Sequence, residues 1–554
     1  MPEPTKLFET RGISSLEKVF ADQDLDAVAY NRASALQGEA YAFQVAYWAA
    51  STIVPISVSV DSTLADRITL RSVGLAPSDL PCQSGHDENI LRETPGLYPD
   101  PLLPIKPTAG VAGLPKQWRS VWVTIELDEN TAIGKHLITV RFSTETEGLL
   151  GGESFELEVI GAPLPEQTLI HTEWFHCDCL AQYYGIEVFS EAHWQIIEQY
   201  VKTAVKHGIN MLLTPLFTPP LDTAVGGERL TVQLVEVKKD GNGYSFGLSR
   251  LKRWIDMCHT AGIRYFEFSH FFTQWGAKHA PKIIAEVDGE QKRIFGWDTD
   301  AAGEAYKDFL HQFLPVLVAF LYEQKLEKHS YFHISDEPLL EHRPWYRSAS
   351  EVLTAHLKGM PVMDAITNLE YYEEGLVKRP VPANNHIEPF LERGVPELWT
   401  YYCCVQYKEV SNRFFNMPSA RNRMMGIQLY KFQMAGFLHW GYNFWNTRYS
   451  LKAIDPYRIT DAGFHFPSGD AFLVYPGEDG RPVESIRMEV FQEGLQDLRA
   501  LQLLESLIGR DQVLEMIEEG LPEPLTFRSY PKEAAWLLNF RESVNAAIKA
   551  HINN

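Results

Sequence analysis

The chain has 554 residues, of which 45% are hydrophobic and 22% charged, the composition of a globular protein with two or three domains. Its net charge of −22, from 72 acidic against 50 basic residues, argues against a nucleic-acid partner. No apolar run approaches the roughly 18 residues that a membrane helix needs, and the first 20 residues do not read as a signal peptide. If Met1 is the native start, we expect a cytoplasmic protein without a membrane partner.

The first third of the chain has the alternating pattern of half-buried β-strands. The segments are short, rich in β-branched and aromatic residues, and separated by Gly, Pro and Asp. They are AYAFQVAYWA (40–49), TIVPISVSV (52–60), SVWVTIELD (120–128), HLITVRFST (136–144) and SFELEVIG (154–161). The pattern predicts an antiparallel β-sandwich over residues 1–165.

After the Pro/Gly linker at 161–167, short apolar runs alternate with amphipathic helical stretches. Eight strands are predicted, at 169–177, 210–215, 264–270, 331–335, 362–366, 381–384, 398–404 and 436–440. Parallel strands with intervening helices predict a (β/α)8 TIM-type barrel over residues 166–510. Residues 511–554 are predicted to form a helical extension packed on the barrel. The fold class is therefore multidomain, β followed by α/β.

Polar and aromatic residues follow the predicted strands, where the active sites of such barrels lie. Two long loops, each of about thirty residues, follow the second and third strands. The candidate substrate-binding residues at these positions are His176, Asp178, His270, Gln274, Trp275, Trp297, Asp364, Tyr401, Tyr402, Trp440 and Asn443. Sugar rings present apolar faces to aromatic side chains and hydroxyls to polar ones, so the mixture indicates a carbohydrate site. For any single Trp, burial in the core is the competing interpretation.

The six cysteines favour neither a disulfide framework nor a metal site. Cys177 and Cys179 form a C-x-C pair, and Cys403 and Cys404 are adjacent, whereas zinc sites typically use C-x-x-C spacing. All four lie in apolar, strand-like runs. We therefore expect buried reduced thiols, no metal and no cofactor.

Two adjacent carboxylates, Asp336 and Glu337, close the fourth predicted strand in YFHISDEPLL (331–340). A D-E-P sequence also suits a solvated acidic turn, but its place at the end of a barrel strand favours a catalytic pair. Catalytic carboxyls of ordinary glycosidases stand roughly 5–9.5 Å apart across the sugar, which adjacent residues fit poorly. They fit substrate assistance, in which the 2-acetamido oxygen of the sugar attacks its own anomeric carbon. Glu337 would then be the general acid, and Asp336 would orient the acetamide.

Four motifs resemble glycoside hydrolase family 123 and the related domain-of-unknown-function family 4091. They are FHISDEP (332–338), GFLHWGYNFWN (436–446), SGDAFLVYPG (468–477) and PVESIRMEVFQEGLQDLRAL (482–501), and the resemblance covers about residues 165–510. It implies an exo-acting, retaining β-N-acetylgalactosaminidase with Asp336 as the acetamide-orienting residue and Glu337 as the acid/base. The implied partner is a short glycan or glycoside ending in a β-N-acetylhexosamine.

Two alternatives remain at this point. One is a glycosidase for a sugar that lacks the acetamido group, with other roles for the acid pair. The other is a non-catalytic carbohydrate-binding protein on a barrel scaffold. The sequence does not decide the leaving group or the oligomeric state.

Overall fold

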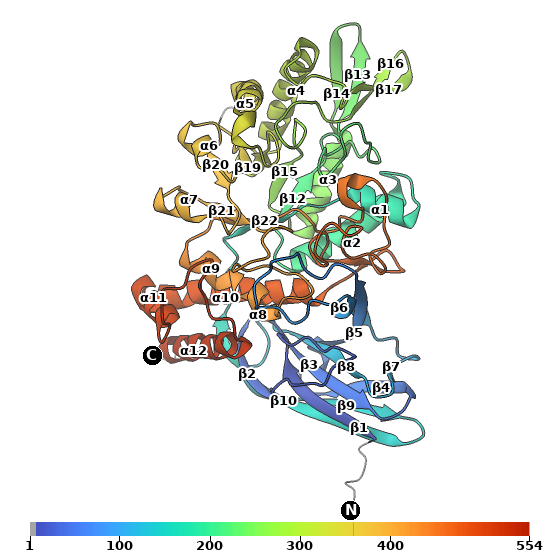
Figure 1. Cartoon of the computed structure of the whole chain (residues 1–554), viewed down its shortest axis with the longest axis vertical. Helices are drawn as coiled ribbons and strands as arrows, with labels where there is room; N and C mark the ends of the chain where they lie inside the picture. Colours follow the sequence, from blue (N-terminus) through green and yellow to red (C-terminus); the bar gives the residue numbers. More distant parts are fainter. Residues whose placement is uncertain (1–6, 358, 553–554) are drawn as a thin grey trace, which may run out of the picture.

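Residues 8–163 form ten strands in two five-stranded sheets (Figure 1). The structure is a computed structural model that describes residues 7–357 and 359–552. In the first sheet every neighbouring pair is antiparallel. Its strands, in spatial order, are β1 (Phe8–Ser14), β3 (Ala40–Ala49), β8 (Trp118–Glu126), β5 (Ile68–Ser78) and β6 (Gly96–Pro104).

The second sheet contains one parallel pair, which the predicted antiparallel arrangement did not include. Its strands, in spatial order, are β2 (Arg32–Gln37), β10 (Gly148–Pro163), β9 (Gly134–Thr144), β4 (Ile53–Asp61) and β7 (Val111–Gly113). β2 and β10 run parallel, and the other neighbours are antiparallel. Parallel strands need a connection longer than a hairpin, and here most of the β region separates β2 from β10.

The two sheets share one hydrophobic core. Phe43 of β3 stacks on Phe155 of β10 with ring centroids 4.3 Å apart. Val123 of β8 and Val140 of β9 are fully buried in the same cluster. Since successive strand residues point to opposite faces, the alternating sequence pattern supplies one apolar face from each sheet.

The next part of the chain is built on parallel strands with helices between them. Six strands form one sheet, in the order β18 (Ser330–Phe332), β15 (Tyr265–Phe268), β12 (Met211–Thr214), β11 (Ile170–Glu173), β22 (Gly436–His439) and β21 (Trp399–Tyr401). β19 (Met363–Ala365) and β20 (Arg379–Val381) form a separate parallel pair. Single bridges, Phe332–Val362 and Ala383–Tyr401, connect this pair to the ends of the six-stranded sheet. Continuous hydrogen-bond ladders thus join six of the eight predicted strands in one sheet and the other two in a pair. A complete eight-stranded ladder, as in the predicted barrel, is not present among the described residues.

Helices cover this sheet and continue to the C-terminus (Figure 1). They are α1 (Cys177–Tyr184), α2 (Glu191–Lys206), α3 (Ser249–Ala261), α4 (Glu304–Glu323), α5 (Arg343–Leu357), α6 (Glu370–Glu373), α7 (Glu388–Glu392), α8 (Ser419–Arg423), α9 (Met425–Lys431), α10 (Ile486–Ile508), α11 (Arg510–Glu518) and α12 (Ala534–Ile552). Within the described ranges, no helix combines the length and apolar character needed to cross a membrane. Short 3-10 turns occur at Ala65–Arg67, Leu340–His342 and Arg448–Ser450.

The two predicted long loops contain a small sheet that the sequence patterns did not indicate. Its strands, in spatial order, are β14 (Gly243–Gly247), β13 (Glu236–Asp240), β16 (Ile283–Val287) and β17 (Glu290–Phe295). β13 and β17 consist largely of charged or polar residues, so they lack the apolar alternation that identifies a strand. A short hairpin of β23 (Tyr475–Pro476) and β24 (Pro482–Val483) lies before α10.

Helix α10 lies between the β region and the α/β region and carries ion pairs to both. Arg487 pairs with Asp100 of β6 at 2.8 Å, and Glu489 pairs with Arg71 of β5 at 2.7 Å. The carboxylate of Asp497 accepts a hydrogen bond from Arg423 of α8 at 2.7 Å. Removing one partner of such a buried pair leaves an uncompensated charge, so these contacts fix the relative placement of the two regions.

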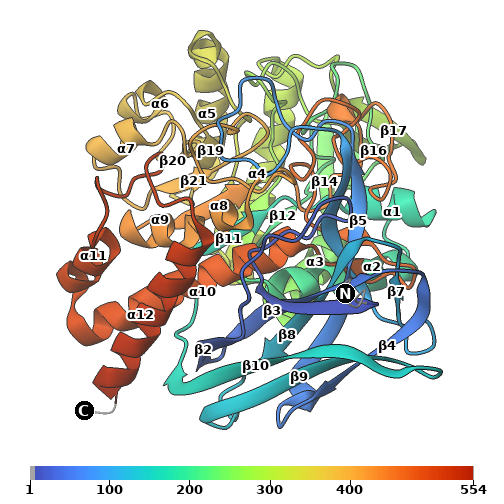
Figure 2. The ribbon, with the colours of Figure 1, turned by 60° about the horizontal axis from the view of Figure 1, so that its bottom comes forward.

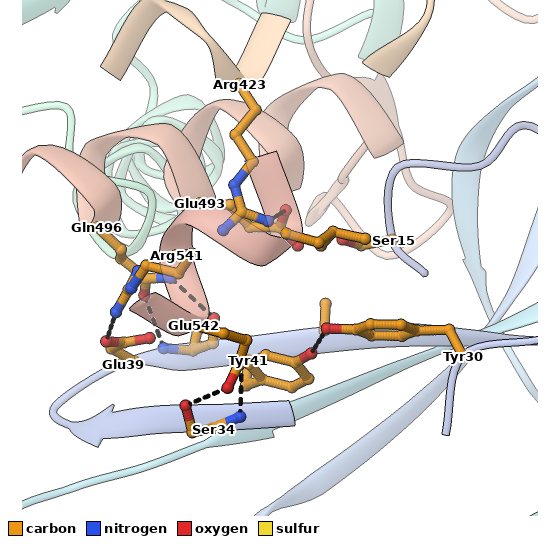
Figure 3. A pocket seen from close by; sticks show the side chains of 13 residues that line it. Ser15, Tyr30, Ser34, Glu39, Tyr41, Arg423, Glu493, Gln496, Arg541 and Glu542 are labelled. Atoms are coloured by element: carbon orange, nitrogen blue, oxygen red, sulfur yellow. Dashed lines mark hydrogen bonds and ion pairs between the residues drawn. The ribbon is translucent and has the colours of Figure 1, made fainter. Parts of the chain in front are cut away.

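The C-terminal helix α12 contacts α8 and α10 of the α/β region, where the sequence predicts it to pack. It also contacts β2 and β10 of the β region. Figure 3 shows this junction: Arg541 reaches Glu39, and Glu542 accepts hydrogen bonds from the backbone and hydroxyl of Ser34 at 2.8 and 2.7 Å. Arg541 also pairs with Asp497 at 2.8 Å. The cavity between these side chains encloses about 20 Å³, room for roughly one water molecule.

The connection between β5 and β6 extends from the β region over the α/β region (Figure 2). Its Asp87 pairs with Arg421 of α8 at 2.8 Å, and the amide of Leu80 donates to Asp461 at 3.1 Å. Ser468 donates its amide to the Leu80 carbonyl at 3.0 Å. This connection therefore holds residues 461–468, and Phe466 of that segment lines a cavity at the ends of the parallel strands.

Candidate active site

A cavity of about 230 Å³ opens where the parallel strands end. The residues lining it come from the ends of β11, β12, β15, β18, β19, β21 and β22 and from the segments that follow them. They are Trp174, His176, Leu221, Asp222, Gln274, Trp275, Asp336, Glu337, Ala365, Tyr401, Cys403, Cys404, Leu438, Trp440, Arg448 and Phe466. Segments far apart in the sequence thus bring aromatic and carboxylate side chains to one place.

Asp336 and Glu337 both line this cavity although they are neighbours in the chain. Strand β18 ends at Phe332, and Glu337 has a left-handed backbone with φ 41°. That conformation interrupts the alternation that would otherwise point neighbouring side chains to opposite faces. A non-glycine residue in this region costs roughly 1–3 kcal/mol, and such strain is typical of functional sites. The Asp336 carbonyl also accepts the amide of Trp275 at 2.9 Å.

The environment of the pair favours its protonated forms. Burial raises the pKa of Asp336 well above its usual value, and the neighbouring Glu337 charge raises it further. Burial also raises the pKa of Glu337, and a hydrogen bond from the Tyr401 hydroxyl to Glu337 Oε1, at 2.5 Å, opposes that rise. Because two adjacent carboxylates repel each other, the pair retains a proton at a higher pH than separated carboxyls do. One group can thus act as an acid while the other is ionised.

Aromatic side chains form much of the cavity wall. The indole of Trp440 donates from Nε1 to Asp470 at 3.0 Å and packs edge-on against Phe466 at 5.3 Å. Trp275 is 40% exposed and meets the ring of Tyr449 at 5.6 Å. Such walls can lie against the C–H face of a sugar ring.

Asp222 and Arg448 add two charged groups to the wall that the sequence patterns did not indicate. Burial raises the pKa of Asp222 to about 6, although its carboxylate accepts the amide of Tyr449 at 2.9 Å. Arg448 donates to the hydroxyl of Tyr449 at 2.7 Å. Both lie in long connections rather than at strand ends, which is why a search of strand ends missed them.

The structure brings some of the predicted substrate-binding residues to the cavity and places others behind its wall. Those that line the cavity are His176, Gln274, Trp275, Tyr401 and Trp440. Those outside its lining are Asp178, His270, Trp297, Asp364, Tyr402 and Asn443.

The predicted residues outside the lining make contacts with other protein groups instead. Tyr402 lies one residue beyond the end of β21 and packs in a different cluster from Tyr401, where its hydroxyl donates to Asn422 at 3.1 Å. Trp297 packs against His279 at 5.9 Å. Asn443 accepts the amide of His176 at 2.8 Å. Of these three, Asn443 is bonded directly to a residue that lines the cavity.

His176 is held as a neutral imidazole by groups behind it. Its Nε2 donates to the carbonyl of Trp440 at 3.0 Å, and its Nδ1 accepts from Arg229 at 3.0 Å. Burial and the Arg229 charge lower the pKa of His176 to about 3. Asp178 pairs with the same guanidinium at 2.8 Å. Arg229 lies in a loop without a recognisable motif, and the sequence analysis did not identify it.

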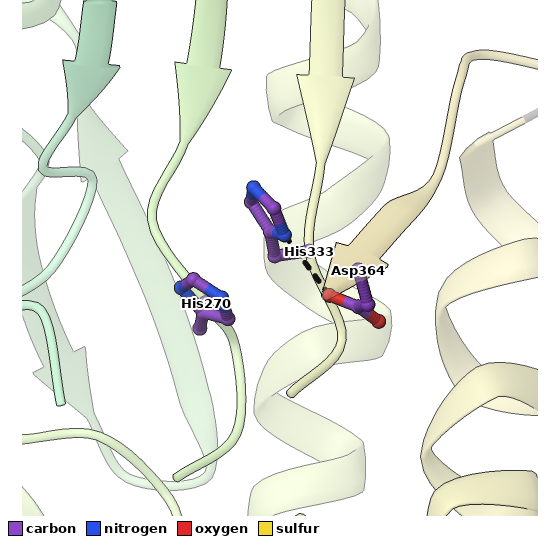
Figure 4. A group of neighbouring side chains, drawn as sticks. All are labelled: His270, His333 and Asp364. Carbon is purple, nitrogen blue, oxygen red and sulfur yellow. Dashed lines mark hydrogen bonds and ion pairs between the residues drawn. The ribbon is translucent and has the colours of Figure 1, made fainter. Parts of the chain in front are cut away.

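His270, His333 and Asp364 form a buried cluster (Figure 4), and the charges of His333 and Asp364 act on Asp336. His333 donates from Nδ1 to Asp364 at 2.9 Å and from Nε2 to Glu267 at 2.6 Å. Burial disfavours its charged form, but the two carboxylates outweigh burial and raise the pKa of His333 to about 10. Both ring nitrogens of His333 are thus already bonded to carboxylates, so they serve the hydrogen-bond network. Asp364 therefore has a partner in the protein itself.

The comparisons with known proteins agree with the sequence motifs. The family described as glycoside hydrolase 123, catalytic domain, matches residues 174–504. A family 123 glycoside hydrolase from Clostridium perfringens, studied for glycolipid glycan hydrolysis, is similar with a TM-score of 0.73 and 15% identity, over 99% of this chain and 97% of that chain. At that identity the likeness shows a shared fold.

Two further solved structures are only weakly similar. The β-glucuronidase of Parabacteroides merdae has a TM-score of 0.32 and 8% identity, over 88% of this chain and 51% of that chain. The endo-β-1,4-mannanase of Thermotoga petrophila has a TM-score of 0.34 and 12% identity, over 60% and 77%. Neither carries an argument. A search of the curated proteins finds no match.

Proposed function

Because the chain belongs to glycoside hydrolase family 123, we propose that it is an exo-acting β-N-acetylgalactosaminidase that works by substrate assistance. Family membership makes it a glycoside hydrolase acting on a glycan, and the finer assignment is our inference. The observation that carries it is the adjacent pair Asp336 and Glu337 in one cavity, with raised pKa values. The substrate is a glycan or glycoside ending in a β-N-acetylhexosamine.

In the proposed reaction, Glu337 protonates the glycosidic oxygen while the acetamide oxygen of the sugar attacks the anomeric carbon. Asp336, as a carboxylate, accepts the acetamide N–H and stabilises the positive charge that develops on the cyclised ring. Glu337, now ionised, removes a proton from the water that opens this ring. Two displacements on one carbon retain the anomeric configuration. Their mutual repulsion keeps one proton on the pair. Without substrate, burial and the Tyr401 hydrogen bond favour Asp336 for that proton, and we propose that the acetamide N–H, donated to Asp336 as a carboxylate, shifts it to Glu337 when the sugar binds.

The size of the cavity supports an exo-acting enzyme. Its volume of about 230 Å³ lies below the roughly 300–1,000 Å³ of pockets for drug-sized ligands. A space of that size suits one terminal sugar ring rather than an internal stretch of a chain.

We further propose that the eight parallel strands belong to one barrel domain over residues 166–510. A β-sandwich domain over 1–165 precedes it, and a helical extension over 511–554 follows it.

A panel of aryl glycosides tests the assignment. We expect hydrolysis of β-GalNAc, slower hydrolysis of β-GlcNAc, and no turnover of β-Gal or β-Glc, because only the first two carry the internal nucleophile. A thiazoline that mimics the cyclised sugar should inhibit tightly. Full activity on β-Gal together with insensitivity to the thiazoline would identify a glycosidase with a protein nucleophile. Binding without turnover of any member would identify a carbohydrate-binding protein.

Tyr401→Phe should move the alkaline limb of the pH profile of kcat/KM to higher pH. The lost hydroxyl stabilises the ionised form of Glu337, so its removal raises the pKa of that carboxyl. A general acid is active when protonated, so activity then persists to higher pH. The measurement is kcat/KM on aryl β-GalNAc from pH 4 to 9.

The matched control for this change is Tyr402→Phe. It removes a hydroxyl from the adjacent residue, which bonds Asn422 and lies outside the cavity. Its profile should coincide with that of the unmodified protein. A limb that stays in place or moves to lower pH in Tyr401→Phe would show that Glu337 is not the titrating acid.

A further inference from the structure

We propose that Asp364, His333 and Glu267 form a buried positioning network that holds the acid pair and the indole of Trp174 in place. The inference rests on the proposed function, since it assigns these residues a part in the same reaction. Asp364 was predicted to bind substrate, and the other two were not singled out. All three are fully buried, and none of them lines the cavity. They are therefore positioning residues rather than catalytic ones.

Asp364 holds the backbone that leads from β18 to the acid pair. Its carboxylate accepts the amide of Ile334 at 3.1 and 3.2 Å, the ring of His333 at 2.9 Å and the hydroxyl of Tyr346. Strand β18 ends at Phe332, so Ile334 lies beyond the sheet ladder, and the carboxylate takes the place of a strand partner. Ile334 is two residues before Asp336. A shift of Asp364 would therefore be passed on to both acids.

Glu267 accepts hydrogen bonds from β11, from the residue that follows it, and from the segment after β18. Its carboxylate accepts the hydroxyl of Thr172 at 2.5 Å, the indole N–H of Trp174 at 2.6 Å and His333 Nε2 at 2.6 Å. Trp174 follows β11 and lines the cavity, whereas Glu267 lies within β15. One carboxylate thus ties an aromatic wall of the cavity to the same histidine that Asp364 holds.

The charges make this arrangement stiff. His333 is a cation between two carboxylates, and each of its N–H groups has one acceptor. The other titratable groups facing it are His270, whose ring stacks on it at 4.2 Å, and Asp336, whereas Tyr346 faces Asp364. Burial and the neighbouring His333 charge lower the pKa of His270 well below its usual value, so His270 adds no second charge. No member can leave its place without exposing a buried charge to an apolar interior.

Asp364→Asn and Glu267→Gln test the network. Each amide keeps the shape of the carboxylate but turns an NH2 group toward groups that are already donors. We expect kcat on aryl β-GalNAc to fall about 10²-fold, as for small misplacements of reacting groups, with a smaller change in KM. Tyr346→Phe removes one donor to Asp364 without burying a new polar group, and we expect a loss of severalfold. It is the test variant if the amide variants fail to fold.

Asp497→Asn is the matched control. Asp497 is also a buried carboxylate with cationic partners, Arg423 and Arg541, but it lies on α10 and outside the cavity lining. It should lower Tm while the folded protein keeps the kcat of the unmodified chain. Unchanged kcat in folded Asp364→Asn and Tyr346→Phe would overturn the proposal.

A measurement without substrate separates this inference from the proposed function. The low-field proton spectrum of the full chain should contain two ring N–H signals of His333 that persist to about pH 9 and vanish in His333→Gln. If these signals are present and the unmodified chain cleaves no member of the aryl glycoside panel, the proposed function fails while the network stands. If they are absent at neutral pH, the network fails whatever the chain hydrolyses.

Discussion

Glu337→Gln should lower kcat/KM on an alkyl β-GalNAc glycoside by about 10²–10⁴-fold, the usual contribution of general acid catalysis. An alkoxide is a poor leaving group and needs a proton from the enzyme as the glycosidic bond breaks. An acidic phenol leaves without one, so the loss on a nitrophenyl glycoside should be much smaller. The measurement is the ratio of the two losses, taken from kcat/KM on both substrates at one pH.

Glu341→Gln is the matched control for this change. It makes the same chemical substitution four residues later, where the side chain is 77% exposed and faces His342. Both substrates should be turned over at the unmodified rate. Equal losses on both substrates in Glu337→Gln would contradict its role as the proton donor and point to a structural effect.

Asp336→Asn should lower kcat by about 10²–10³-fold on both substrates alike, a range typical of removing one group that stabilises a developing charge. The carboxylate acts on the acetamide and not on the leaving oxygen, so leaving-group acidity should not matter. The amide can still lie beside the acetamide but carries no charge to oppose the positive ring. Affinity for the thiazoline should fall together with kcat, because the inhibitor mimics that ring.

The two variants also distinguish substrate assistance from a protein nucleophile. With Asp336 as nucleophile, Asp336→Asn would abolish turnover, a covalent glycosyl-enzyme would form on the unmodified protein, and sugars without the acetamide would be hydrolysed. Mass spectrometry of the unmodified protein during turnover of a slow substrate should therefore find no added sugar. A mass increase of one N-acetylhexosamine residue on the peptide carrying Asp336 would contradict the proposed mechanism.

Sequence reasoning singled out the acid pair as a candidate because its signal is local. FHISDEP ends an apolar strand, and Pro338 follows at once, so chemistry and position are visible within seven residues. The same holds for the alternating strands before residue 165 and for the β/α pattern after it. The strand β13, with its charged sequence EVKKD, had no such signal and was missed. Patterns of apolar residues report burial, and exposed strands bury too little to leave one.

Which of the candidate side chains face the cavity could not be predicted from the sequence, because their orientation depends on tertiary contacts. Tyr401, the last residue of β21, reaches Glu337, while the next residue, Tyr402, turns to Asn422. The sequence does not reveal which of two adjacent tyrosines at the end of a short buried strand faces the cavity. The partners of Asp364 and Glu267 come from separate strands and helices, so no spacing in the chain relates them. The sequence by itself determined the chemistry available and the family to which it belongs. Folding brings together the groups that line the cavity and the groups behind them, because burial and hydrogen-bond partners depend on segments that meet only when the chain is folded.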